Sequence, residues 1–178
     1  MAASVPGPIV VVPAFLASGH HVRKDIPRQL AKAGRADAVL APALGAHPAV
    51  VATAHRRLLA AGHRRGDAVV LACAGTRDER ARAESHDRAR ALARLLDTPV
   101  AAGYVATGGP TVTEQVARLR AQGHERVSVA TWLLAPGLFH DRLAASGADV
   151  VAPPLCPDPA IAHAVAERYR QAAIPLPV

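Results

Sequence analysis

The chain has 178 residues, of which 51% are hydrophobic and 20% charged, so it can build an ordinary core, and disordered and fibrous proteins are excluded. Its 21 Lys and Arg exceed its 14 Asp and Glu and leave a net charge of +7, which suits an anionic partner but is also typical of Arg-rich sequences from GC-rich genomes. Because the arginines are scattered and only 3% of residues are aromatic, we do not expect a nucleic acid as that partner.

The first apolar run, at 8–17, is too short to span a bilayer. It does not resemble a signal peptide either, because no Lys or Arg precedes it and Pro13 interrupts it. A similar run recurs at 127–137, which a targeting segment would not explain. We therefore expect a cytoplasmic protein that does not bind a membrane.

Short β-branched runs alternate along the chain with longer segments of helical period. We predict strands at 9–12, 38–41, 68–72, 100–105, 126–134 and 149–152, and helices at 26–33, 48–61, 78–96, 111–122, 139–145 and 159–172. Several strands are continuous apolar runs, which indicates that both of their faces are covered, as in a parallel sheet between helices. The sequence therefore predicts an α/β fold with parallel sheets flanked by helices.

Two helix starts carry the signature of a capping box, in which a Ser or Thr is followed three residues later by Glu. Thr111 and Glu114 form one, and Thr76 and Glu79 form the other. We also expect Asp25 to cap the helix that begins near Ile26.

Right-handed crossovers between parallel strands place every strand-to-helix turn at one edge of the sheet, where ligands bind in such folds. The segments expected at this edge are 20–21, 45–47, 74–77, 107–110, 136–140 and 154–158. Functional residues should be sought among them.

The chain also repeats itself. Residues 13–27 (PAFLASGHHVRKDIP) resemble residues 131–143 (TWLLAPGLFHDRL), and residues 36–50 resemble residues 148–161. Two further strand-helix units precede the second copy, at 68–122, whereas little precedes the first. The sequence therefore predicts related βα repeats, the first of them incomplete.

His20 and His21 directly follow the segment Leu-Ala-Ser-Gly after the first predicted strand, so we expect them at the functional edge. Imidazole is the commonest side-chain metal ligand and a base near neutral pH, so these residues are candidates for holding a divalent cation or accepting a proton. In extended chain, adjacent side chains point opposite ways, so we expect only one of the two to face the site. Cys73 and Cys156 are far apart and outside any CxxC spacing, which favours buried thiols over a zinc site or a disulfide.

The segment from Gly19 to Pro27 has the pattern G-x-H-x-x-x-D-I-P and is followed by LGAHP. In this pattern the chain resembles the sirohydrochlorin chelatases, class II enzymes that insert cobalt or ferrous iron into a modified tetrapyrrole for cobalamin or siroheme. The likeness covers nearly the whole chain and implies chelatase-like βα repeats, with a partial N-terminal domain at 1–64 and a C-terminal domain at 65–178. It implies a lyase-class enzyme whose divalent metal is a substrate, with no organic cofactor.

The chain departs from this family at a second histidine, which the family carries in an H-G-S-R motif. That motif is absent, Ala74 stands in its place within AGTR, and Phe139 falls opposite His21. By this resemblance we expect the chain to begin at the third strand of the N-terminal domain and to lack about half of that domain, which a shortened gene model and a natural short form would both explain. An open strand edge would then need the second domain or another copy of the chain, so a homodimer is possible.

The resemblance gives His21 the role of catalytic proton acceptor and metal ligand, facing an anionic tetrapyrrole with many carboxylates. The implied metal ligands are His21, His20 and His140, and the implied substrate-binding residues are Arg23, Lys24 and Arg142. The alternative is a non-catalytic protein that binds metal or tetrapyrrole on a degenerate chelatase scaffold, and a purely structural subunit is a third, weaker possibility. The sequence does not choose between cobalt and iron.

Overall fold

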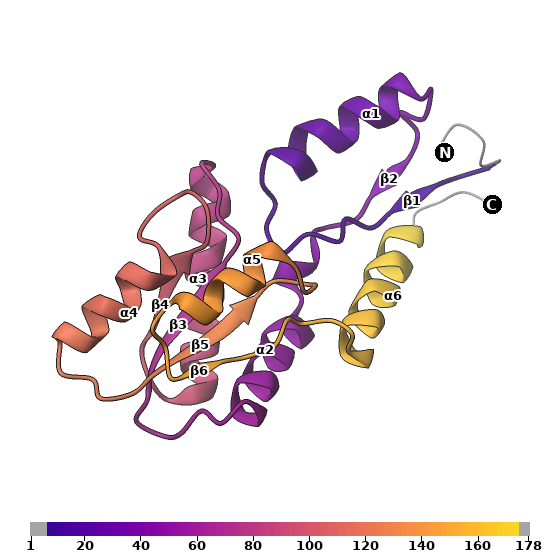
Figure 1. The fold of residues 1–178 in the computed structure, drawn as a ribbon. Helices are drawn as coiled ribbons and strands as arrows, with labels where there is room; N and C mark the ends of the chain where they lie inside the picture. The colour runs from indigo at the N-terminus through magenta and orange to yellow at the C-terminus, as the bar shows by residue number, and fades with distance from the viewer. Residues whose placement is uncertain (1–6, 175–178) are drawn as a thin grey trace.

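The computed structural model describes residues 7–174, which form two parallel sheets flanked by helices (Figure 1). The smaller sheet pairs β1 (Val10–Val11) with β2 (Val39–Leu40). The larger sheet has the strand order β4-β3-β5-β6 and consists of β3 (Ala68–Cys73), β4 (Val100–Tyr104), β5 (Val127–Trp132) and β6 (Val150–Val151). All the predicted strands are confirmed, with ends shifted by one or two residues, and so is the α/β fold.

All six predicted helices are also found, and the structure adds two short helical turns at 21–25 and 44–46 that the sequence analysis had not predicted. The longer ones are α1 (Ile26–Lys32), α2 (Pro48–Ala60), α3 (Glu79–Leu96), α4 (Val112–Ala121) and α6 (Pro159–Ala173). Shorter helical turns are η2 (His21–Asp25), η3 (Leu44–Ala46), α5 (Leu138–Asp141) and η4 (Arg142–Ala145). Among the described residues no helix is both long enough and apolar enough to cross a bilayer.

Strand β3 shows why the apolar runs lack alternation. All six of its residues are buried, because successive side chains enter two different cores. Val69 and Leu71 belong to the core that α2 and α3 cover, whereas Val70 and Ala72 belong to the core that α4 covers. Helices on both faces therefore bury both sides of the strand, as predicted from its composition.

The internal repeat is visible in the structure. The unit β1-η2-α1-β2-α2 corresponds to the unit β5-α5-η4-β6-α6, and in each the last helix begins at a proline. His47 caps α2 by accepting a hydrogen bond from the backbone N–H of Ala49, and Asp158 caps α6 by accepting one from Ala160. The two units exchange their last helices, since α2 packs against β5 of the larger sheet and α6 packs against β1 and β2.

The boundary predicted between residues 64 and 65 lies in the connection from α2 to β3, and the division into two domains stays a prediction. Because α2 and α6 each pack across that boundary, the two halves share part of their core.

One of the two predicted capping boxes is confirmed. The Thr111 hydroxyl accepts a hydrogen bond from the backbone N–H of Glu114, whose carboxylate accepts one from Thr111 N–H. The box predicted at Thr76 is wrong. Asp78 is the N-cap of α3 instead, because it directly precedes the first helical residue and its carboxylate accepts hydrogen bonds from the first turn.

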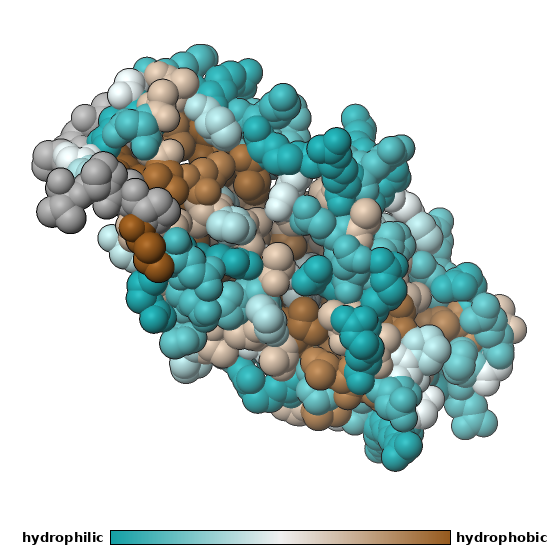
Figure 2. Space-filling model, turned by 180° about the vertical axis from the view of Figure 1, so that it is seen from behind, coloured by the Kyte–Doolittle hydropathy of each residue, from teal (hydrophilic) through white to brown (hydrophobic). Residues whose placement is uncertain are grey.

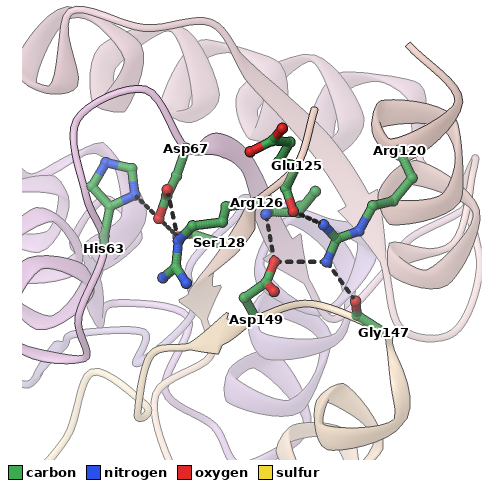
Figure 3. A network of polar contacts seen from close by, with 9 residues as sticks. His63, Asp67, Arg120, Glu125, Arg126, Ser128, Gly147 and Asp149 are labelled. Atoms are coloured by element: carbon green, nitrogen blue, oxygen red, sulfur yellow. Dashed lines mark hydrogen bonds and ion pairs between the residues drawn. The ribbon is translucent and has the colours of Figure 1, made fainter. Parts of the chain in front are cut away.

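A polar network ties together the amino ends of three strands in the larger sheet (Figure 3). Asp67, before β3, accepts hydrogen bonds from the Arg126 guanidinium and the Ser128 hydroxyl of the β5 region. Asp149, before β6, accepts one from the backbone N–H of Val127 and forms an ion pair with Arg120. This network lies at the edge opposite to the carboxyl ends of the strands, so it stabilises the sheet at a distance from the predicted functional edge.

Candidate functional site

A cavity of about 600 Å³ opens at the carboxyl ends of strands from both sheets. One wall comes from residues 14–22, which follow β1, and the other from residues 73–77 at the end of β3, with Thr107 after β4 and residues 132–134 at the end of β5. The edge predicted from strand topology therefore carries a cavity lined by residues of both sheets.

His20 and His21 both line this cavity, with 71% and 73% of their side chains exposed. The prediction that only one of them faces the site is wrong, because the backbone here is helical rather than extended: His20 has φ −53° and ψ −42°, and His21 begins η2. The ring centroid of Phe15 lies 6.1 Å from that of His21 in a stacked arrangement. An aromatic face thus borders the imidazole.

Asp25 contacts both imidazoles. Its Oδ2 lies 2.7 Å from Nδ1 of His21, and its Oδ1 lies 3.6 Å from Nε2 of His20. The expectation that Asp25 caps α1 is wrong, since its side chain makes no cap hydrogen bond and the helical backbone of η2 runs directly into α1. The carboxylate is therefore available to orient the imidazoles.

The hydrogen bond to Asp25 selects one tautomer of His21. A carboxylate can only accept, so Nδ1 of His21 donates to it and Nε2 keeps its lone pair. A carboxylate behind an imidazole both fixes the ring and raises its basicity as a metal ligand. In this tautomer His21, which lines the cavity, has a lone pair on Nε2 that is free to bind a metal ion.

The cations predicted to bind substrate take three different positions. Arg23 is half-buried and forms an ion pair with Asp78, the N-cap of α3, so it links η2 to α3. Lys24 is exposed on η2 and makes no ion pair or hydrogen bond within residues 7–174. The Arg142 guanidinium lies 5.9 Å from the centroid of the Phe139 ring, on the exposed η4.

His140 is not brought together with His20 and His21. Its Nε2 lies 3.2 Å from the carbonyl oxygen of Ala152, and it lines a separate hollow formed by residues 133–140. No cluster of three or more His, Cys, Asp or Glu side chains in the described chain is arranged to hold a metal ion.

Thr76, Arg77 and Trp132 also line the cavity. The first two belong to the segment 74–77 that was expected at this edge, although no role was predicted for either. Trp132 was not predicted, and its position at the carboxyl end of β5 is the signal that could have found it. Trp132 is buried, and its indole Nε1 has no hydrogen-bond partner among the described residues.

The cavity floor contains a thiol that remains protonated. Burial raises the pKa of Cys73 to about 12, while a hydrogen bond with Ser85 lowers it slightly. Metal ions are bound by thiolates rather than thiols, so Cys73 contributes apolar surface at neutral pH. Cys73 and Cys156 are both free, as predicted, although only Cys73 is fully buried.

The model of the CbiX family matches residues 1–61 and 68–172. No curated protein sequence matches the chain. Among solved structures, SirB from Bacillus subtilis with Fe³⁺ superimposes with a TM-score of 0.81 at 19% identity, over 94% of this chain and 72% of that one.

Two further structures are similar. CbiX, described as the terminal enzyme for biosynthesis of siroheme in denitrifying bacteria, has a TM-score of 0.70 at 23% identity, over 92% of this chain and 75% of that one. The sirohydrochlorin chelatase SirB from Bacillus subtilis subspecies spizizenii, in complex with cobalt, has a TM-score of 0.69 at 16% identity, over 94% of this chain and 70% of that one. At these identities the superpositions show a shared fold.

Proposed function

The chain belongs to the CbiX family, and from this premise we propose that it is a sirohydrochlorin-type chelatase, which inserts Co²⁺ or Fe²⁺ into a modified tetrapyrrole. The observation that carries the proposal is the His21 imidazole, oriented by Asp25 at 2.7 Å and lining a cavity of about 600 Å³. Fe³⁺ and cobalt in the similar structures support a metal as the substrate.

Insertion of a divalent ion requires two pyrrole protons to leave the macrocycle while the ion sheds its waters. The lone pair on Nε2 of His21 can hold the ion or accept one of these protons, and Asp25 stabilises the imidazolium that results. His20, which contacts the same carboxylate at 3.6 Å, is proposed as a second ligand. No covalent intermediate and no organic cofactor is needed.

The substrate would be an anionic macrocycle, and the cavity suits such a shape. Its lining is mainly apolar and includes Phe15 and Trp132, which offer flat surfaces to a conjugated ring. We propose Lys24 and Arg142 as cations that attract substrate carboxylates from outside the cavity. Arg23 would act indirectly, because its ion pair with Asp78 holds η2, and with it His21, against α3. His140 remains a proposed metal ligand only if its Nε2 gives up the contact with the carbonyl oxygen of Ala152.

We also propose a cytoplasmic location. Both cysteines in the described part of the chain are free thiols, which is typical of proteins from a reducing compartment.

A second candidate function is non-catalytic binding of a metal or a tetrapyrrole. The observation that favours it is Ala74, which lines the cavity at the position where the resembled family carries the histidine of its H-G-S-R motif. Without that imidazole, the opposite wall offers no second base for the second pyrrole proton.

The test is to mix the purified chain with sirohydrochlorin and Co²⁺ or Fe²⁺ and to follow the absorbance change of the macrocycle. We expect acceleration over the uncatalysed rate, lost in His21→Ala and retained in the control His124→Ala, whose imidazole is exposed near the start of β5. A rate equal to the uncatalysed one would overturn the enzyme proposal. Macrocycle binding without that acceleration would establish the second candidate.

A further inference from the structure

The loop after β3 carries Arg77, which lines the same cavity as His21. The backbone N–H of Thr76 donates to the carbonyl oxygen of Thr107 at 2.8 Å, and Ala106 N–H donates to the carbonyl oxygen of Ala74 at 3.0 Å. Gly75 has φ +112°, and a Cβ there would lie 2.4 Å from the Thr107 carbonyl oxygen. The close contact of the two loops therefore fixes the backbone that carries Arg77.

Arg77 is a cation that lines the cavity and that no other described group pairs with. Arg23 is paired with Asp78, and the Arg82 guanidinium donates to the carbonyl oxygen of Gly108 at 3.0 Å. Arg77 is exposed, lines the cavity and makes no ion pair or hydrogen bond within residues 7–174. No Asp or Glu lines the described cavity, so nothing on its wall neutralises this guanidinium.

The Arg77 guanidinium and the imidazoles of His20 and His21 line the same cavity. The loop of Arg77 packs on the segment that carries His20 and His21, since a Cβ built at Gly19 would lie 3.9 Å from the Thr76 hydroxyl oxygen. A ligand in the cavity would therefore be within reach of both the imidazoles and the guanidinium. Arg binds carboxylates through two parallel hydrogen bonds, which fixes orientation as well as charge.

We propose that Arg77 binds a carboxylate of the macrocycle and thereby positions its ring nitrogens against His21. This inference rests on the proposed function, because it assigns the substrate class, a carboxylate-bearing macrocycle, to the same cavity. The loop after β3, which carries no imidazole, thus supplies the anion-binding part of the cavity wall.

The test uses Trp132, which is the only tryptophan of the chain and lines the same cavity. Quenching of its fluorescence by uroporphyrin, a metal-free porphyrin with eight carboxylates, reports binding. We expect Arg77→Ala to raise the Kd about tenfold and Arg77→Lys to raise it less, because an ammonium keeps the charge but loses the paired hydrogen bonds. Arg80→Ala is the matched control, since Arg80 is exposed at the start of α3 and does not line the cavity.

A tetracationic porphyrin of the same ring size distinguishes charge recognition from damage to the fold. Its Kd should not rise in Arg77→Ala, whereas a misfolded cavity would weaken both porphyrins. An unchanged uroporphyrin Kd in Arg77→Ala, equal loss in Arg80→Ala, or no uroporphyrin binding by the wild-type chain would each overturn the inference.

Steady-state kinetics of metal insertion distinguish a failure of this inference from a failure of the proposed function. We expect Arg77→Ala to raise the KM for sirohydrochlorin and to lower kcat only in part, because the ring is then held less well against His21, and His21→Ala to abolish kcat. If the wild-type chain binds uroporphyrin through Arg77 but inserts no metal, the inference stands and the chelatase proposal fails. If insertion depends on His21 and the KM is unaffected by Arg77→Ala, the chelatase proposal stands and the inference fails.

Discussion

The carboxylate of Asp25 lies one helical turn from His21 and 2.7 Å from its Nδ1, with 22% of the Asp25 side chain exposed. The π-helical turn η2 produces this geometry, because it brings residues four apart onto the same side. The partly buried carboxylate orients a mostly exposed imidazole that lines the cavity. The pair therefore has the arrangement in which an acidic residue tunes a metal ligand.

Replacing Asp25 should weaken metal insertion without removing the ligand itself. We expect Asp25→Ala to lower the apparent metal affinity or the insertion rate about 10- to 100-fold, as for other residues that orient a metal-binding histidine. Asp25→Asn should retain part of the activity, because the amide oxygen can still accept from Nδ1. Initial insertion rates measured at several Co²⁺ concentrations give both quantities.

The matched control for Asp25 is Asp87→Ala, since Asp87 forms an ion pair on the exposed face of α3 with Arg90. Its insertion rate should equal that of the wild type. If Asp25→Ala and Asp87→Ala behave alike, Asp25 has no role in orienting His21.

Gly75→Ala should destabilise the fold more than an ordinary glycine substitution. Gly75 combines a positive φ with a Cβ position only 2.4 Å from the Thr107 carbonyl oxygen, whereas Gly66 has φ +96° with nothing within 4 Å. Positive φ costs an alanine about 1–2 kcal/mol, and displacing the packed loop adds about 1–3 kcal/mol. Urea unfolding should show a larger loss for Gly75→Ala than for Gly66→Ala, and equal losses would contradict the close loop contact.

The strands and the functional edge could be predicted from the sequence because both follow from local patterns. The residues of β3 are all apolar and all buried, so composition alone predicted a strand with both faces covered. The position of His20 and His21 after β1 then placed them at the cavity through topology. The internal repeat could be predicted from the sequence for a similar reason. Each copy ends in a helix whose first residue is a proline and whose N-cap side chain accepts a hydrogen bond.

The side-chain contacts of the site could not be predicted, because they depend on packing between distant segments. Arg23 pairs with Asp78, which lies 55 positions away along the chain, so its role as a link between η2 and α3 has no local signal. The contact of His140 with the Ala152 carbonyl depends on how α5 lies over β6. The helical backbone at His20 could not be predicted from the sequence either, since an extended chain was expected there. This helical backbone allows both imidazoles to contact the Asp25 carboxylate.

The open edge of β1 predicts self-association through a second copy of the chain. The carbonyl oxygens of Ile9 and Val11 accept hydrogen bonds from the β2 segment, so the backbone groups of Val10 point to the other side, where no described strand pairs. The strand residues are only half-buried, and Figure 2 shows apolar surface at this end of the molecule, in the upper left. Exposed strand edges of this kind pair readily with another chain.

We therefore expect a homodimer in light scattering coupled to size-exclusion chromatography. Val10→Pro removes the backbone N–H that faces the open edge and should give a monomer with an unchanged far-ultraviolet circular dichroism spectrum. Val10→Ala keeps that N–H and should remain dimeric. A monomeric wild-type chain would contradict this prediction.

His63 should make the stability of the fold depend on pH below neutrality. Its side chain is only 4% exposed, and burial lowers its pKa below the ordinary value of 6.5 despite the opposing attraction of Asp67, whose Oδ2 lies 3.7 Å from Nδ1 (Figure 3). As the pH falls through 6.5, the unfolded chain takes up a proton that the folded chain does not. The free energy of unfolding therefore decreases from pH 6.5 downward until the lower folded pKa is reached.

His63→Leu removes this proton uptake, so the free energy of unfolding should fall less steeply between pH 7.5 and pH 5 than in the wild type. Urea unfolding at a series of pH values measures the slope. His124→Leu is the control, because His124 is exposed and its removal should leave the slope unchanged. Equal slopes in His63→Leu and the wild type would show that His63 is protonated alike in the folded and unfolded chains, and that its burial does not govern the acid sensitivity of the fold.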